Sequence, residues 1–207
     1  MPPPAVSETL TSVVTALDSK DPCTEGHSQK VASYAAILAE AAGMSETEIE
    51  EVRLAGLLHD IGKVGIPEAV ILKSGPLDPT EWDLMQQHVR HGARILQPFP
   101  EIAAIREMVE HHHEFFDGSG YPDGLAGEAI PLGARIIALA DAYDTITSER
   151  SYQRARSPEE AFTVLERCSG AQFDPRLVEL FVEALRRRSH PLIDSTPAAV
   201  PVATTAS

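Results

Sequence analysis

The chain has 207 residues, of which 43% are hydrophobic, and a formal net charge of -14. This length suits one domain with a sizeable core, and no apolar run approaches the roughly 18 residues that a membrane span requires. The acidic charge excludes a general binder of nucleic-acid polymers, because neutralising phosphates needs a basic face.

The N-terminal segment MPPPAVSETL lacks the basic start and apolar block of a secretory signal. We therefore expect a cytoplasmic protein without membrane attachment. Residues 1–20 predict a linker that leads into a short helix. Cys23 and Cys168 lie far apart and neither has a CxxC neighbour, so free thiols are expected rather than a disulfide or a cysteine zinc site.

Helix signals dominate the rest of the chain. Apolar residues recur at helical spacing, first between Val31 and Ala42. Ser45, Asp78 and Ser157 are each followed three residues later by glutamate, which predicts capped helix starts. Asp174 with the proline after it predicts the start of a last helix.

No run of alternating strand residues stands out, so the predicted fold class is all-α, a compact helical bundle. Loops are expected at roughly 62–78, 115–132 and 148–157. The domain is expected to span 21–188. Residues 189–207 are rich in Pro, Ala and Thr and predict a disordered tail.

Several predicted helices carry histidine or aspartate on or beside an apolar face. Such groups seldom occupy these places without a partner. Ligands that converge from facing helices are typical of a metal site in the core of a bundle. The candidates in chain order are His27, His59, Asp60, His88, His112, His113 and Asp141.

Asp60 is the most informative candidate because it directly follows the apolar segment LAGLLH. An unpaired carboxylate on the buried side of a helix would be costly, and a metal ion removes that cost. A carboxylate can also bridge two ions, so the sequence predicts a binuclear centre. Lys63, four residues after His59, is placed to add a positive charge near the same site.

Nitrogen and oxygen ligands without a thiolate suit iron, manganese or zinc, and we expect iron or manganese. Two such ions can clamp a phosphate, activate a shared water as hydroxide and stabilise a leaving oxygen. Metals with a few basic side chains would also let an acidic protein hold a small anionic ligand.

Each candidate also has a plain structural explanation when it is taken alone. The run from His111 to His113 could be a polar helix end, His27 a helix cap and Lys63 a surface lysine. A shared metal site explains the ligand candidates together, whereas otherwise each needs a separate partner. His91 and His190 are expected to lie outside the ligand set.

Four segments closely resemble the HD-GYP family, the cyclic di-GMP phosphodiesterase branch of the HD-domain metal-dependent phosphohydrolases. They are HDIGKVGIP, HHEFFDGSGYPDGL, IPLGARIIALADAYDTITSERSY and GAQFDP. The resemblance runs from about Asp21 to Leu185, with the motifs in family order. It implies a compact all-α domain, in agreement with the helical pattern.

Carried over by position, the resemblance implies two metal ions and a bridging Asp60. One ion would take His27, His59 and Asp141, and the other His88, His112 and His113. Asp60 and Lys63 would be the catalytic residues, with Lys63 near the attacked phosphate. The substrate would also contact the loop residues Gly120, Tyr121 and Pro122 and the basic residue Arg150. His111 is then an extra histidine, expected behind the ligands or on the surface.

Two departures bear on this transfer. Some members use a glutamate to hold a third metal where this chain has Cys23, so we expect two ions. Gln153 stands where a basic residue is common in the family.

The expected function is hydrolysis of cyclic di-GMP to the linear dinucleotide pGpG, with further cleavage to GMP as an open outcome. Two alternatives stay open: a phosphohydrolase for another cyclic dinucleotide, and a binding or interaction module that has lost turnover. Family members usually carry a sensor or receiver domain. Either this protein acts alone or its sensor lies elsewhere, with a homodimer or a signalling protein as candidate partners.

Overall fold

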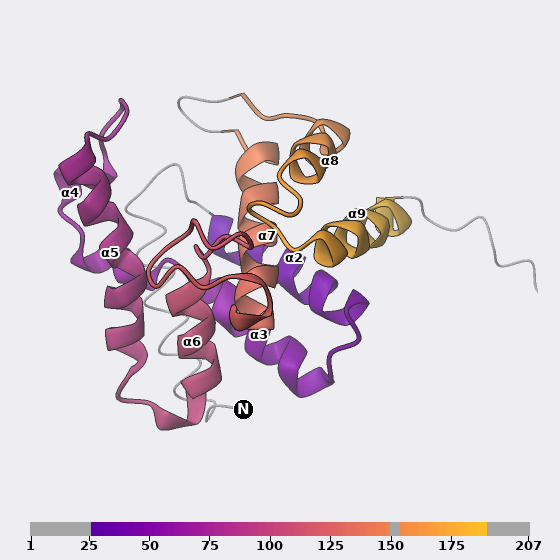
Figure 1. Cartoon of the computed structure of the whole chain (residues 1–207), viewed down its shortest axis with the longest axis horizontal. Helices are drawn as coiled ribbons and strands as arrows, with labels where there is room; N and C mark the ends of the chain where they lie inside the picture. Colours follow the sequence, from indigo (N-terminus) through magenta and orange to yellow (C-terminus); the bar gives the residue numbers. More distant parts are fainter. Residues whose placement is uncertain (1–25, 150–153, 190–207) are drawn as a thin grey trace, which may run out of the picture.

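The structure is a computed structural model that describes residues 26–149 and 154–189 (Figure 1). Cys23, Arg150, Gln153 and His190 lie outside these ranges. The expected N-terminal helix and nearly all of the expected tail also lie outside them.

Regular secondary structure in the described part of the chain is helical, apart from an isolated β-bridge between Ser169 and Phe173. The all-α fold class is thereby confirmed. The α-helices are α2 (His27–Ala41), α3 (Glu46–Leu58), α4 (Glu68–Ile71), α5 (Pro79–Leu96), α6 (Ala103–His111), α7 (Leu132–Thr147), α8 (Pro158–Arg167) and α9 (Pro175–Ser189). The 3-10 helices are η1 (Ile61–Gly65), η2 (Pro100–Ile102) and η3 (Gly127–Ala129).

The capped helix starts predicted from the sequence are present. Ser45, Asp78 and Ser157 each accept a hydrogen bond from the backbone N–H three residues later, and the glutamate there bonds back to the cap. These reciprocal bonds satisfy backbone donors that have no partner within the helix. They start α3, α5 and α8.

The segment at 62–78, predicted as a loop, contains α4 and most of η1. Likewise η3 lies within the predicted loop at 115–132. Gly62 lets η1 pack tightly against α5, since a Cβ at this position would lie 1.8 Å from the carbonyl oxygen of His88. Tertiary packing therefore determines these short turns, and it brings the segment after Asp60 against the helix that carries His88.

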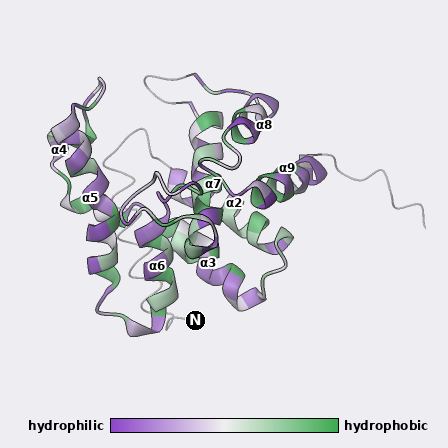
Figure 2. Cartoon of the chain, in the orientation of Figure 1, coloured by the Kyte–Doolittle hydropathy of each residue, from purple (hydrophilic) through white to green (hydrophobic). Residues whose placement is uncertain are grey.

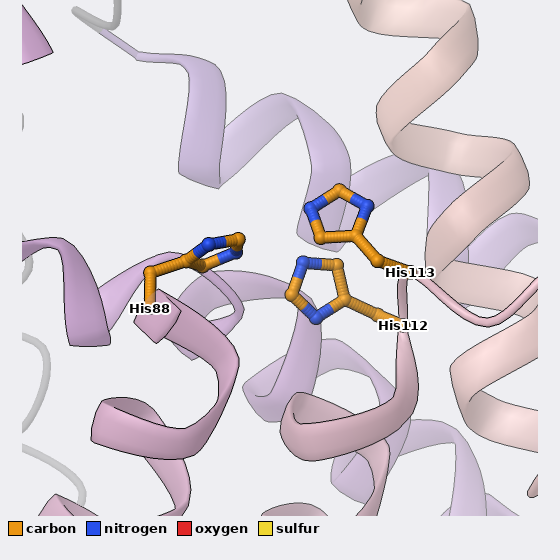
Figure 3. A group of neighbouring side chains, drawn as sticks. All are labelled: His88, His112 and His113. Carbon is orange, nitrogen blue, oxygen red and sulfur yellow. The ribbon is translucent and has the colours of Figure 1, made fainter. Parts of the chain in front are cut away.

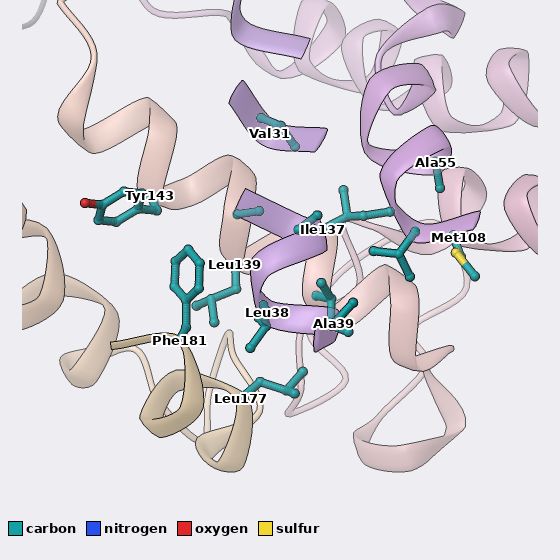
Figure 4. Packing of buried hydrophobic residues seen from close by; sticks show 14 of the residues in the cluster. Val31, Leu38, Ala39, Ala55, Met108, Ile137, Leu139, Tyr143, Leu177 and Phe181 are labelled. Carbon is teal, nitrogen blue, oxygen red and sulfur yellow. The ribbon is translucent and has the colours of Figure 1, made fainter. Parts of the chain in front are cut away.

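The core forms where α2 packs on α3, α7 and α9, and where α6 bridges from α5 to α3 and α7. Val31, Ile137 and Phe181 belong to its cluster of buried hydrophobic residues and have no solvent exposure (Figure 4). Figure 2 shows purple and green residues side by side along α5, as expected for a helix with one buried face. Among the helices described here, none combines the length and apolar character that a membrane crossing requires.

Candidate metal centre

One group of potential ligands consists of three histidines from two helices. His88 lies on α5, His112 is the C-cap of α6 and His113 follows it. Ligand nitrogens of the three residues lie within 4.8 Å of one another. Figure 3 shows the three rings turned toward a common point. We call this group the three-histidine trio.

A second group combines two histidines and an aspartate from three helices. His27 is the first residue of α2, His59 is the C-cap of α3 and Asp141 lies in α7. Their ligand atoms also lie within 4.8 Å of one another, and His27 Nε2 is 3.2 Å from Asp141 Oδ1. We call this group the mixed trio.

Asp60 lies between the two trios. Its Oδ2 is 3.3 Å from Nε2 of His59 in the mixed trio, and its Oδ1 is 3.6 Å from Nε2 of His88 in the three-histidine trio. Each carboxylate oxygen therefore faces one trio, as a bridging ligand would. Lys63 Nζ donates to Asp60 Oδ2 at 2.6 Å, which brings its positive charge to the same place.

The backbone selects which nitrogen each of three histidines offers to the centre. His59, His88 and His112 each donate from Nδ1 to the carbonyl three residues earlier at 2.8 Å. In a neutral ring this leaves the Nε2 lone pair available.

These three Nε2 atoms are buried, and no residue in the described part of the chain supplies any of them with a hydrogen-bond partner. Buried acceptors without partners are costly. A metal ion would satisfy them, and a backbone carbonyl on the opposite nitrogen is the usual support for a metal-binding histidine. The residues therefore fit a metal centre.

The pKa values also suit this donor set. Burial lowers the pKa of His88 and His112, and it lowers the pKa of His113 to about 3, so all three rings stay neutral. Burial alone would raise the pKa of Asp60, but Lys63 and His59 more than offset this effect and hold it well below the usual range. Neutral imidazoles and ionised carboxylates are the forms that bind metals.

His27 differs from the other histidines because carboxylates surround it. Burial opposes its protonation, but hydrogen bonds to Asp141 and Asp144 raise its pKa to about 9. A bound ion would replace this proton. Asp144 was missed in the sequence, although it lies three residues after Asp141 and so close to the same side of α7.

Asp144 is buried and holds His27 in orientation. His27 Nδ1 donates to Asp144 Oδ2 at 2.6 Å, and Ser148 Oγ donates to Asp144 Oδ1 at 2.9 Å. This leaves His27 Nε2 facing Asp141. Asp144 thus supports a ligand from behind, as carboxylates often do in histidine metal sites.

Glu114 was also missed, and it fastens the Gly-Tyr-Pro loop to the centre. Its buried carboxylate accepts hydrogen bonds from the backbone N–H groups of Asp123 at 2.7 Å and Leu125 at 3.0 Å. The Tyr121 N–H donates to the His113 carbonyl at 3.1 Å. The loop therefore leaves the last histidine of the trio and folds back over it.

The close approach of this loop requires a glycine at position 120. A Cβ there would lie 2.2 Å from the backbone nitrogen of Phe115. The Tyr121 ring follows at 5.0 Å from the His113 ring, measured between centroids. Gly120 and Tyr121 thus lie beside the candidate centre with Pro122 next along the chain, whereas Arg150 is outside the described residues.

His111 lies outside both trios, as expected. Its Nε2 is 3.2 Å from Asp123 Oδ2, and Arg90 also contacts that carboxylate. His111 and Asp123 form a further cluster with Glu114, but both carboxylates already accept hydrogen bonds, so this cluster braces the loop. His91 lies outside all of these clusters and packs against Gly65.

Comparison with known proteins identifies the class of this fold and site. The family model for the HD domain matches residues 12–177. The chain belongs to the HD domain family.

Curated relatives agree with the HD-GYP resemblance, which is confirmed. The chain is 40% identical over 176 residues to the cyclic di-GMP phosphodiesterase response regulator RpfG of Xanthomonas campestris, covering 83% of this chain and 46% of the relative. It is 38% identical over 178 residues to 3'3'-cGAMP-specific phosphodiesterase 2 of Vibrio cholerae, covering 85% of this chain and 34% of the relative. It is 41% identical over 168 residues to a cyclic di-GMP phosphodiesterase of Thermotoga maritima, covering 79% of this chain and 45% of the relative. The chain spans less than half the length of these relatives.

Solved structures show the same fold. A cyclic GMP-AMP specific phosphodiesterase of Vibrio cholerae superimposes with a TM-score of 0.69 at 25% identity, covering 88% of this chain and 49% of that one. The HD domain of the phosphodiesterase PgpH of Listeria monocytogenes, in complex with cyclic di-AMP, gives a TM-score of 0.57 at 18% identity over 90% of this chain and 100% of that one.

Proposed function

We propose that this chain is a metal-dependent phosphodiesterase that hydrolyses cyclic di-GMP to pGpG, with further cleavage to GMP as an open outcome. The observation that carries the proposal is Asp60, with one carboxylate oxygen toward each of two ligand trios. Relatives named as cyclic di-GMP phosphodiesterases support the substrate class. We assign this activity to residues 21–188.

The mixed trio would hold one ion and the three-histidine trio the other, with Asp60 as a ligand to both. When bound, two divalent ions supply Lewis-acid activation of water and neutralise charge at the phosphate. Iron or manganese suits this nitrogen and oxygen donor set, which has no thiolate. Two ions are proposed because Cys23 replaces the glutamate that holds a third in some family members.

The side chains around the ions would orient the phosphate and balance its charge. Asp60 is held ionised, so it can keep its position between two cations. Lys63 Nζ, 2.6 Å from Asp60 Oδ2, would stabilise negative charge on the attacked phosphate. Gly120 keeps the loop close to His113, so that Tyr121 and Pro122 can line the substrate. Arg150 would add a second positive charge.

A second candidate substrate is 3'3'-cGAMP. One relative named as specific for it is 38% identical to this chain, against 40% for the cyclic di-GMP relative. A binding module without turnover is the remaining alternative. A cytoplasmic location, and pairing with a second copy or a signalling protein, stay predictions.

The test is purification without oxygen, metal analysis, and parallel turnover assays on cyclic di-GMP, 3'3'-cGAMP and cyclic di-AMP. We expect two bound ions and the highest kcat/KM on cyclic di-GMP. A clear preference for another cyclic dinucleotide would replace the substrate assignment. A fully metal-loaded protein that binds cyclic di-GMP and cleaves none of the three would establish the binding module.

A further inference from the structure

Trp82 is the only tryptophan of the chain and is solvent-exposed. It lies near the start of α5, six residues before His88, and 47% of its surface is accessible. A large aromatic side chain buries most of its surface in a typical fold. Nearly half of this residue is therefore accessible to a flat ligand.

Trp82 forms one wall of an aromatic corner beside the candidate metal centre. Its ring lies 6.2 Å from the Tyr121 ring at an interplanar angle of 82°. Tyr121 is in turn 5.0 Å from the His113 ring. The Tyr121 ring therefore lies between Trp82 and a candidate metal ligand.

The Tyr121 side of the corner is held in place. The Tyr121 N–H bonds to the His113 carbonyl, and Glu114 anchors the loop on the far side of Tyr121 through the N–H of Asp123. Asp123 is also held by an ion pair with Arg90 and by a hydrogen bond with His111. A ligand that binds between the two rings would therefore contact Tyr121, which the loop holds in place, and the exposed Trp82 on α5.

We propose that Trp82, with Tyr121 as the adjoining wall, is a stacking subsite for one purine base of the cyclic dinucleotide. This inference rests on the proposed function and names the residue that would recognise the base. Bases stack on aromatic side chains because both have extended π faces. The phosphate of the same nucleotide would then reach the metal centre past Tyr121.

The test compares a substrate that has bases with one that has none. Cyclic di-GMP and bis(p-nitrophenyl) phosphate both offer a phosphodiester to the centre, but only cyclic di-GMP carries a purine on a ribose. The p-nitrophenyl rings are bonded directly to the phosphate oxygens, so with the phosphate at the centre they do not extend past Tyr121 to Trp82. The metal-loaded chain, Trp82→Ala, Trp82→Phe and a control, Leu84→Ala, would be assayed on both. Leu84 lies on the same helix and is 41% exposed.

We expect Trp82→Ala to lower the ratio of kcat/KM for cyclic di-GMP over the aryl diester about 5- to 150-fold, the equivalent of about 1–3 kcal/mol of stacking per base. Trp82→Phe should give a smaller loss, because a smaller π face remains. Leu84→Ala should leave the ratio unchanged. As Trp82 is the only tryptophan, rapid mixing of the parent chain with cyclic di-GMP should also change the protein fluorescence.

An unchanged ratio in Trp82→Ala, with both substrates cleaved, would overturn the subsite and leave the proposed function intact. An equal loss in Leu84→Ala would also overturn it, because the effect would then not be specific to the indole. Cleavage of the aryl diester without cleavage of cyclic di-GMP would instead contradict the proposed function, and the subsite with it.

Discussion

Replacing Asp144 should weaken one of the two proposed metal sites and leave the other unchanged. The carboxylate accepts from His27 Nδ1 at 2.6 Å in a buried setting. A hydrogen bond to a charged group contributes about 1.5–3 kcal/mol, and loss of such a supporting partner typically costs about 10- to 100-fold in metal affinity. These two estimates agree, since each factor of ten corresponds to about 1.4 kcal/mol.

Asp144→Asn keeps an acceptor oxygen but loses the charge, so its metal affinity should fall toward the lower end of that range. Asp144→Ala loses both the oxygen and the charge and should fall toward the upper end. Of the two trios, only the mixed trio contains His27. Competition with a chromogenic chelator should therefore show a lower metal affinity at one site and an unchanged affinity at the other. In the metal-free Asp144→Asn variant, NMR titration should also show a lower pKa for His27 than about 9.

Glu159→Gln is a suitable control, since Glu159 is an exposed acid on α8 that pairs with Arg186. Its loss changes the net charge equally without touching the centre. Parent-like affinity for both ions in a folded Asp144→Ala variant would refute the role given to Asp144. An equal loss of metal affinity at both sites would also refute it.

Three further predictions concern the fold around the centre. Gly62→Ala should lower the free energy of unfolding by about 1–3 kcal/mol or more, because its Cβ would lie 1.8 Å from the His88 carbonyl oxygen; a parent-like urea midpoint would contradict this. Glu114→Gln should reduce turnover at constant metal content, since an amide nitrogen cannot accept a backbone N–H bond and the unsatisfied group costs about 1–3 kcal/mol; unaltered turnover would count against the loop anchor. In the metal-free protein, burial lowers the pKa of His112 and His113. As the pH falls below about 6.5, the unfolded chain therefore binds protons that the folded chain does not, and the free energy of unfolding should fall by up to about 1.4 kcal/mol per histidine per pH unit. A flat stability profile down to about pH 5 would disprove this.

The parts of the fold with local signals were predictable from the sequence. Ser45, Asp78 and Ser157 mark helix starts because both partners of each capping box lie within four residues. The turns η1 and α4 were not predictable, because a single turn has no apolar period to detect. The position of η1 depends on how closely Gly62 approaches α5.

The candidate site likewise has residues that the sequence identified and residues whose roles depend on contacts made only after folding. The resemblance to the HD-GYP family grouped the seven expected ligands by position, and the fold brings them together in the same two trios around Asp60. Asp144 and Glu114 were missed because their partners, His27 and the backbone of the Gly-Tyr-Pro loop, become neighbours only after folding. An acidic residue one helical turn from a proposed ligand is the signal that could have revealed Asp144.

Asp60→Ala tests the bridged metal centre directly when it is compared with the parent chain, both purified without oxygen and assayed on cyclic di-GMP. Asp83→Ala, an exposed aspartate on α5, controls for loss of an acidic side chain. We expect fewer than two bound ions in Asp60→Ala and a fall in kcat larger than the roughly 100-fold loss typical of a supporting residue. Two retained ions with undiminished cleavage of cyclic di-GMP would contradict a centre bridged by Asp60.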